Sequence, residues 1–70
     1  MDLKKVKEMM KKGLIKFDTK SIKVGWCENE ECIKIIVSIN DLDTDLREIK
    51  DAVESVLAFY TDKYLLLIEI

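Results

Sequence analysis

The chain has 70 residues, of which 49% are hydrophobic and 37% are charged, and its formal net charge is −2. A chain of this length forms one domain with a small core, and its hydrophobic content excludes intrinsic disorder. No apolar run approaches the roughly 20 residues that span a bilayer, and no secretory signal is visible. We therefore expect one compact domain over residues 1–70, located in the cytoplasm. The absence of Gln, together with many Lys and Glu residues, is typical of thermophilic proteins.

The charges divide unevenly along the chain. Residues 1–26 hold eight lysines and three carboxylates, a formal +5, whereas residues 27–70 hold four basic residues and eleven carboxylates, a formal −7. A domain this small cannot keep the two halves far apart. The asymmetry must therefore shape either the fold or a surface that a partner recognises.

Residues 2–12 are predicted to form a helix. Leu3, Val6 and Met10 recur at spacings of three and four, which places them on one stripe. Gly13 follows two lysines, and this pattern is typical of a C-terminal cap near the negative end of the helix dipole. The next four residues fit either a short edge strand or a linking turn.

Two alternating segments, residues 21–26 and 32–40, predict a β-hairpin. Four polar residues separate Cys27 from Cys32, so a four-residue loop would place the two cysteines opposite each other. The resulting register pairs apolar residues on one face: Trp26 with Ile33, Val24 with Ile35, and Ile22 with Val37. A slip by one residue would destroy this match. We expect the apolar face, Trp26 included, to pack against the helices.

Residues 41–60 predict a second helix, and residues 63–70 predict a final strand. The apolar stripe of this helix consists of Leu42, Leu46, Ile49, Val53, Val56, Leu57 and Tyr60. The final strand is apolar on both faces, which is typical of a central or covered strand. The order α-β-β-α-β predicts an α+β two-layer sandwich, in which both helices cover one face of a small mixed sheet.

Cys27 and Cys32 are the first candidates for chemistry. Opposed residues of an antiparallel hairpin come close enough for a disulfide, which would staple the hairpin unless the thiols stay free. A redox switch is an alternative, although the spacing is not the C-x-x-C of redox motifs. A metal site is another alternative, but two thiols and no His leave a zinc site two ligands short. We expect no metal and no cofactor.

Catalytic groups are scarce in this chain. Without His it offers no Ser–His or Cys–His pair, and it has neither a P-loop nor a dinucleotide-binding motif. Asp41, Asp43 and Asp45 begin like a calcium loop, but that loop requires Gly at its sixth position and Glu at its twelfth. The chain has Leu46 and Ala52 there, so we interpret the aspartates as helix caps. We expect that the chain is not an enzyme.

The lysine-rich first half indicates nucleic-acid binding as an alternative function, because lysines can neutralise a phosphate backbone. The candidate contacts are Lys4, Lys5, Lys11, Lys12, Lys23 and Lys34. The negative net charge of the whole chain opposes a dedicated nucleic-acid binder, for which a basic domain is expected. A solvated helix face that pairs with acidic residues is the simpler interpretation.

The sheet face away from the helices is expected to carry large apolar side chains, including Ile36. One side of the final strand joins it: either Tyr64, Leu66 and Ile68, which with Ile36 are our candidate interface residues, or Leu65 and Leu67. An apolar patch of this size is uncommon on a monomer. We therefore predict a non-enzymatic interaction or accessory protein. It would form a homodimer, or bind a partner protein, through the open sheet face or the edge of the last strand.

Overall fold

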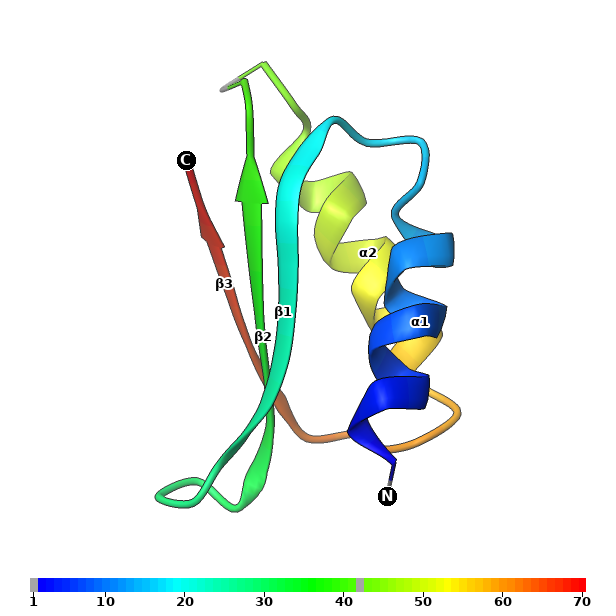
Figure 1. Ribbon diagram of the computed structural model, residues 1–70, viewed down its shortest axis with the longest axis vertical. Coiled ribbons are helices and arrows are strands. Elements are labelled where there is room, and N and C mark those ends of the chain that lie inside the picture. Colours follow the sequence, from blue (N-terminus) through cyan, green and yellow to red (C-terminus); the bar gives the residue numbers. More distant parts are fainter. Residues whose placement is uncertain (1, 42) are drawn as a thin grey trace.

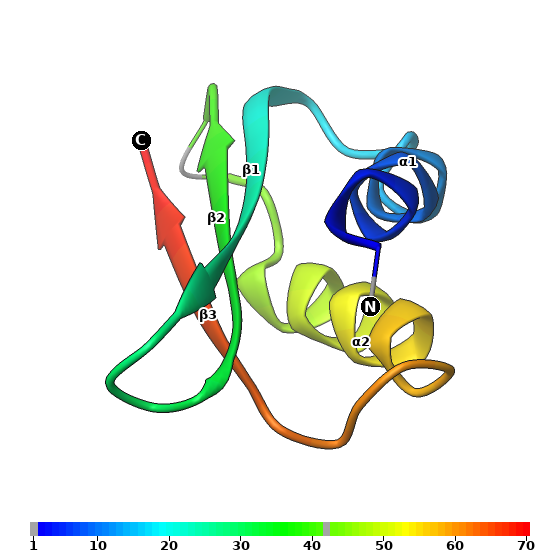
Figure 2. The same ribbon diagram turned by 60° about the horizontal axis from the view of Figure 1, so that its bottom comes forward.

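The computed structural model describes residues 2–41 and 43–70, with two helices and three strands in the predicted order. The elements are α1 (Leu3–Gly13), β1 (Thr19–Cys27), β2 (Cys32–Ile39), α2 (Leu46–Leu57) and β3 (Tyr64–Glu69). Both helices lie against the same face of the sheet, as Figures 1 and 2 show. The predicted α+β architecture with order α-β-β-α-β is confirmed. Neither of these described helices has the length and apolar character needed to cross a bilayer.

α1 begins after Asp2, whose carboxylate accepts a hydrogen bond from the Lys4 amide at 3.0 Å. Gly13 is the last helical residue and its φ is not positive, so our prediction that it serves as a cap glycine is wrong. Leu14 occupies the cap position instead. Residues 14–17 form a turn, which is the second of the two predicted alternatives.

β1 and β2 form the predicted antiparallel hairpin in the predicted register, with Cys27 opposite Cys32 across a four-residue loop. The other predicted pairs are also present: Trp26 with Ile33, Val24 with Ile35, and Ile22 with Val37. The loop ends at Glu31, whose φ of 52° lies in the left-handed region. This conformation lets the chain reverse within four residues.

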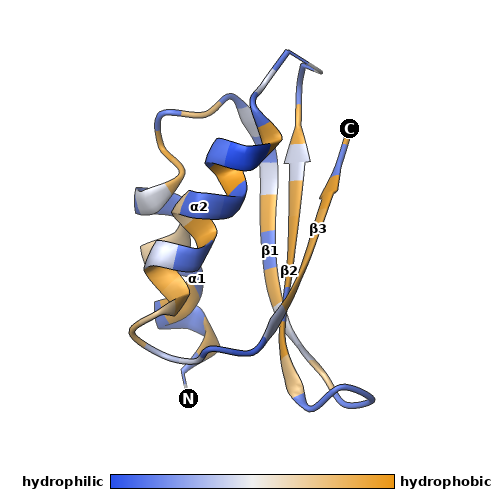
Figure 3. Cartoon of the chain, turned by 180° about the vertical axis from the view of Figure 1, so that it is seen from behind, coloured by the Kyte–Doolittle hydropathy of each residue, from blue (hydrophilic) through white to orange (hydrophobic). Residues whose placement is uncertain are grey.

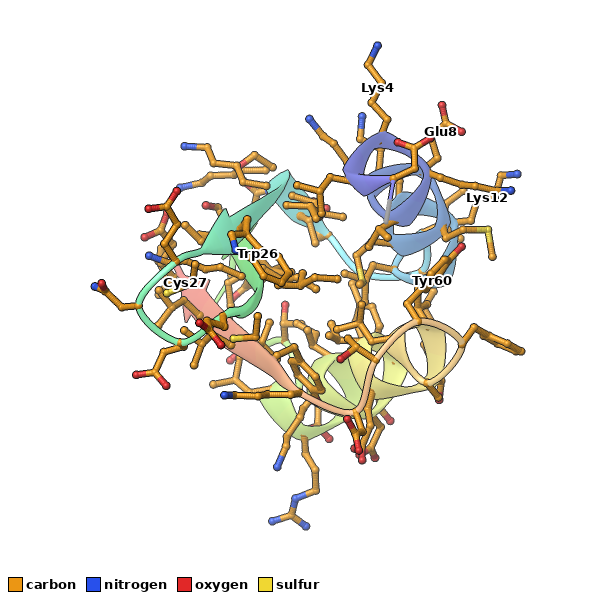
Figure 4. The ribbon with its side chains drawn as sticks, turned by 90° about the horizontal axis from the view of Figure 1, so that it is seen from below. Lys4, Glu8, Lys12, Trp26, Cys27 and Tyr60 are labelled. Carbon is orange, nitrogen blue, oxygen red and sulfur yellow. The ribbon has the colours of Figure 1, made fainter. Side chains whose placement is uncertain are left out.

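Trp26 lies on the helix-facing side of β1 but does not belong to the core. Figure 4 shows Trp26 on the side of β1 toward the helices and Cys27 on the opposite side. Because 52% of the Trp26 surface is exposed, the prediction that it packs in the core is wrong. The hairpin curves away from the helices at its closed end (Figure 1), which leaves the tryptophan beyond the helical layer.

The sheet has the order β1-β2-β3, with β2 in the centre and β3 parallel to it. β3 is therefore an edge strand, so the first of the two predicted alternatives, a central rather than a covered strand, is wrong. The core lies between β2 and the two helices and consists of Val6, Met10, Leu14, Ile22, Ile33, Ile35, Val37, Ile39, Ile49, Val53 and Leu57. The half-buried side chains of β3 pack against the border of this core.

α2 begins after Asp45, whose carboxylate accepts a hydrogen bond from the Arg47 amide at 2.9 Å. The helix ends at Leu57, earlier than the predicted end near Tyr60. Leu42, which the predicted apolar stripe included, lies outside the described residues. Leu46 belongs to the same predicted stripe but is 49% exposed, because it borders an open groove described below.

Candidate functional site

β3 forms an exposed apolar edge of the sheet, and we call this strand the β3 edge. Its alternate residues point to opposite sides. Leu65 and Leu67 face outward, where 36% and 50% of their surfaces are exposed. The opposite side carries Tyr64, Leu66 and Ile68, which lie beside core residues of β2. Figure 3 shows hydrophobic colour along most of β3.

The structure separates the four candidate interface residues. Ile36 lies on the outer face of β2, beside Leu67. The three candidates on β3 instead lie on the helix-facing side, so Leu65 and Leu67 form the outer side of this strand. The sequence left these alternatives open because both sides of the strand are apolar. That these residues contact a partner remains a prediction.

An open groove with a volume of about 670 Å³ runs between α2 and the β3 edge, and we call it the α2–β3 groove. It is lined by Leu46, Arg47, Lys50, Tyr64, Leu66 and Ile68. The groove exists because the helices bury the core side of β2 completely but leave the same side of β3 half-buried. Arg47 and Lys50 were not among the site residues expected from the sequence. Their spacing of three residues beside the apolar stripe was the signal that could have found them.

Tyr64 lies at the end of the groove where the acidic residues of α2 gather. Partial burial, and then the negative charges of Glu54 and Asp51, raise the pKa of its hydroxyl. The hydroxyl is therefore held in its neutral form, in which it can donate a hydrogen bond.

The opposite edge of the sheet has protection that β3 lacks. β1 carries the exposed residues Lys20 and Lys23 and has a register irregularity between Thr19 and Ser21, and α1 packs beside it. Charges, bulges and covering helices are the usual features that block edge-to-edge pairing. Residues 64–68 contain no charged residue and no proline. The two edges therefore differ in their readiness to accept another strand.

Cys27 and Cys32 lie opposite each other at the closed end of the hairpin, and both thiols are free. Cys32 is buried, whereas Cys27 is partly exposed. Within residues 2–41 and 43–70, no group of three or more Cys, Asp or Glu side chains is placed to hold a metal ion. The staple and the redox switch both remain predictions.

Of the three aspartates before α2, only Asp45 acts as the predicted helix cap. Asp45 caps α2, and the Asp41 carboxylate accepts a hydrogen bond from the Asp43 amide at 2.9 Å. The interpretation as a helix cap is therefore confirmed for Asp45, whereas Asp41 organises the turn before the helix and does not cap it.

The six candidate nucleic-acid contacts do not form one surface. Lys4, Lys5, Lys11 and Lys12 are exposed on α1, and Figure 4 shows Lys4 and Lys12 projecting away from the sheet. Lys23 and Lys34 lie on the outer face of the sheet, where they border a shallow hollow of about 150 Å³ beside Gly25. A nucleic acid that contacted all six would have to touch two opposite faces. Binding of this kind stays a prediction.

Comparisons with protein-family models, with curated proteins and with solved structures find no match to this chain. The function must therefore be inferred from the geometry of the molecule itself. Its most distinctive features are the β3 edge and the adjoining α2–β3 groove.

Proposed function

We propose that this chain is a non-enzymatic interaction protein that accepts a partner strand along the β3 edge, with the cytoplasm as its location. In this mode of association, the free backbone N–H and C=O groups of an edge strand pair with an extended segment of another molecule. Side chains on both faces of the joined strands then leave water. The hydrophobic effect and the new backbone hydrogen bonds act together.

The contrast between the two sheet edges carries this proposal. β1 has lysines and a register irregularity, whereas β3 presents five consecutive residues without a charge. An unprotected apolar edge is an aggregation hazard unless a specific partner covers it. The exposed Leu67 and the half-buried Leu66 support this proposal, because both leave apolar surface that an added strand could cover.

A peptide with the sequence of residues 63–70 and a solubilising lysine tag provides a probe strand. Titrated onto isotope-labelled protein, it should shift the amide resonances of β3 and of the α2–β3 groove. The double variant Leu65→Lys/Leu67→Lys should lose this response, because two charges on the outer side of the β3 edge would replace apolar contacts with the added strand. Circular dichroism of the variant checks that the fold is kept.

Ile36→Lys is the matched control, because Ile36 lies on the outer face of the central strand and cannot touch a strand added at the edge. Its response to the probe should equal that of the wild type. Shifts confined to the outer face of β1 and β2, or lost only in Ile36→Lys, would show that the open face binds partners and that the edge does not.

A further inference from the structure

Four charged residues share one flank of α2 because of their spacings of three and four: Arg47, Lys50, Asp51 and Glu54. We call them the α2 charge stripe. Arg47 and Lys50 line the groove itself. Glu54 lines the adjoining hollow at Tyr64, and the charge of Asp51 also acts on Tyr64. The stripe is therefore basic toward the start of α2 and acidic toward its end.

This order of charges is unfavourable for an isolated helix. The helix dipole favours acidic residues near the N-terminus and basic residues near the C-terminus, and the stripe has the reverse order. Lys50 and Glu54 are four residues apart, but with the basic residue first, which is the weaker orientation for a pair on one helix. A neighbouring surface with the opposite order of charges would compensate for both effects.

A second copy of the chain supplies that opposite order. Two β3 strands can pair antiparallel about a twofold axis perpendicular to the sheet, which creates one six-stranded sheet with all helices on one side. α2 runs antiparallel to β3 (Figure 1), so the two α2 helices also run antiparallel to each other across the joined grooves. The basic half of each stripe then faces the acidic half of the other. Arg47 and Lys50 line the groove together with the β3 side chains, so they lie on the flank of α2 that faces the joined edge.

The alternation of β3 restricts the register of such a pair. Directly opposite residues of antiparallel strands lie on the same side of the sheet, so outward residues must face outward residues. This condition is met when Leu66 lies opposite Leu66 of the second copy. Leu65 then faces Leu67, and Tyr64 faces Ile68, so every pair between these residues is apolar.

The charged residues at the two ends of β3 distinguish this register from its neighbour. With Leu66 at the twofold axis, Lys63 of each copy lies opposite Glu69 of the other, and opposite charges in facing positions stabilise a strand pair. A shift that brings Leu67 to the axis would instead place Glu69 against Leu65. The first register therefore satisfies both the apolar and the charged residues.

We propose that the partner of the β3 edge is a second copy of this chain, paired antiparallel about Leu66 with the two α2 charge stripes in opposition. This proposal rests on the proposed function, because it names the strand that the edge accepts. In the dimer the two α2–β3 grooves join beneath the extended sheet. Leu65 and Leu67 of both copies form one row on the outer side.

Charge-reversed variants test the opposition of the stripes. Arg47→Glu/Lys50→Glu makes the stripe entirely acidic, and Asp51→Lys/Glu54→Lys makes it entirely basic. Each variant alone should dimerise roughly tenfold more weakly than the wild type at low salt, because like charges then face each other. An equimolar mixture should form the heterodimer preferentially, which native mass spectrometry resolves by mass. Raising the salt should reduce the difference.

Cysteine cross-linking tests the register in a Cys27→Ser/Cys32→Ala background. Leu66→Cys should form an intermolecular disulfide under mild oxidation, because opposed residues at a twofold axis have a compatible separation. Leu67→Cys is the matched control and should cross-link at least tenfold more slowly. Faster linkage through Leu67→Cys would overturn the register. Circular dichroism of the background confirms that it folds.

The outcomes separate this proposal from the function on which it rests. A wild-type chain that stays monomeric in sedimentation at high micromolar concentration, but still binds the probe peptide at β3, overturns the second copy and keeps the edge. A dimer that is insensitive to both charge reversals overturns the opposed stripes. Loss of probe binding and of dimerisation together would remove the proposed function itself.

Discussion

Gly13 at the end of α1 lies so close to Val56 of α2 that a Cβ on the glycine would be 2.7 Å from the Val56 Cγ2 atom. Carbon atoms in ordinary contact are about 3.5–4.0 Å apart. The valine cannot easily rotate away, because β-branched side chains have one strongly preferred rotamer in a helix. The close approach of the two helices, and not chain reversal, therefore accounts for glycine at this position.

Gly13→Ala is expected to destabilise the protein by about 1–3 kcal/mol, the usual cost of overpacking a core. At an open helical position the same change would stabilise by up to about 1 kcal/mol through helix propensity. Urea unfolding of Gly13→Ala gives the change in the free energy of unfolding. In a Val56→Ala background the substitution should become neutral or stabilising. An unchanged penalty there would show that Val56 is not the cause.

The two opposed thiols predict an intramolecular disulfide on oxidation. Treatment with a small-molecule disulfide should remove two hydrogen atoms from the monomer, as mass spectrometry detects, and should abolish reaction of Cys27 with thiol reagents. The bond closes a short loop, so the oxidised form should be more stable by about 2 kcal/mol at most. Cys27→Ser should remove the difference between oxidised and reduced protein. Oxidation that yields only intermolecular species would contradict the facing geometry.

The raised pKa of the Tyr64 hydroxyl predicts a loss of stability at alkaline pH. The folded state favours the neutral phenol, so no penalty exists below the tyrosine's unfolded pKa. Stability falls as the pH rises through that value toward the higher pKa of the folded state. The variant Tyr64→Phe has no hydroxyl to ionise, so it should lose less stability than the wild type over this pH range. Glu54→Gln should move the ultraviolet titration of Tyr64 to lower pH, and no movement would exclude Glu54 as a cause.

The exposed lysines of α1 predict weak nucleic-acid binding that salt removes. The log of the affinity falls linearly with the log of the salt concentration. The variant Lys11→Glu/Lys12→Glu should make this fall shallower by about 2, because each phosphate contact contributes roughly 0.9 to the steepness. The control variant is Lys23→Glu/Lys34→Glu. These two lysines lie on the opposite face of the sheet, so the salt dependence should not change. Fluorescence anisotropy with a labelled oligonucleotide measures both variants. Tight binding at physiological salt that needs both lysine pairs would favour the nucleic-acid function over the interaction edge.

The order of the elements and the hairpin register are predictable because several local signals agree. Two alternating segments lie on either side of a four-residue polar loop, and only one register pairs Trp26 with Ile33 and keeps the apolar residues together. The apolar residues of α2 recur with the helical period over three turns. Such signals act between near neighbours in the chain, so they can be read without knowledge of the tertiary structure.

The position of β3 and the exposure of Trp26 could not be predicted from the same signals. β3 is apolar on both sides, so its pattern fits a central strand, and only its pairing with β2 alone makes it an edge. Trp26 lies on the predicted, helix-facing side of β1, but at the point where the hairpin curves beyond the helices. The α2–β3 groove likewise depends on where α2 lies over the sheet, which no local spacing specifies.

The parallel pair of β2 and β3 joins distant parts of the chain, and the Ser38 hydroxyl donates to the Glu69 carboxylate at 3.0 Å across a separation of 31 residues. Contacts between remote residues form slowly because closing a long loop costs entropy. The hairpin should therefore assemble early, and β3 should be the last strand to reach its place. During that delay a refolding molecule carries a loose apolar segment beside a vacant position on β2. At high protein concentration, refolding molecules should consequently exchange this segment with one another. The recovery of native protein should therefore rise with dilution.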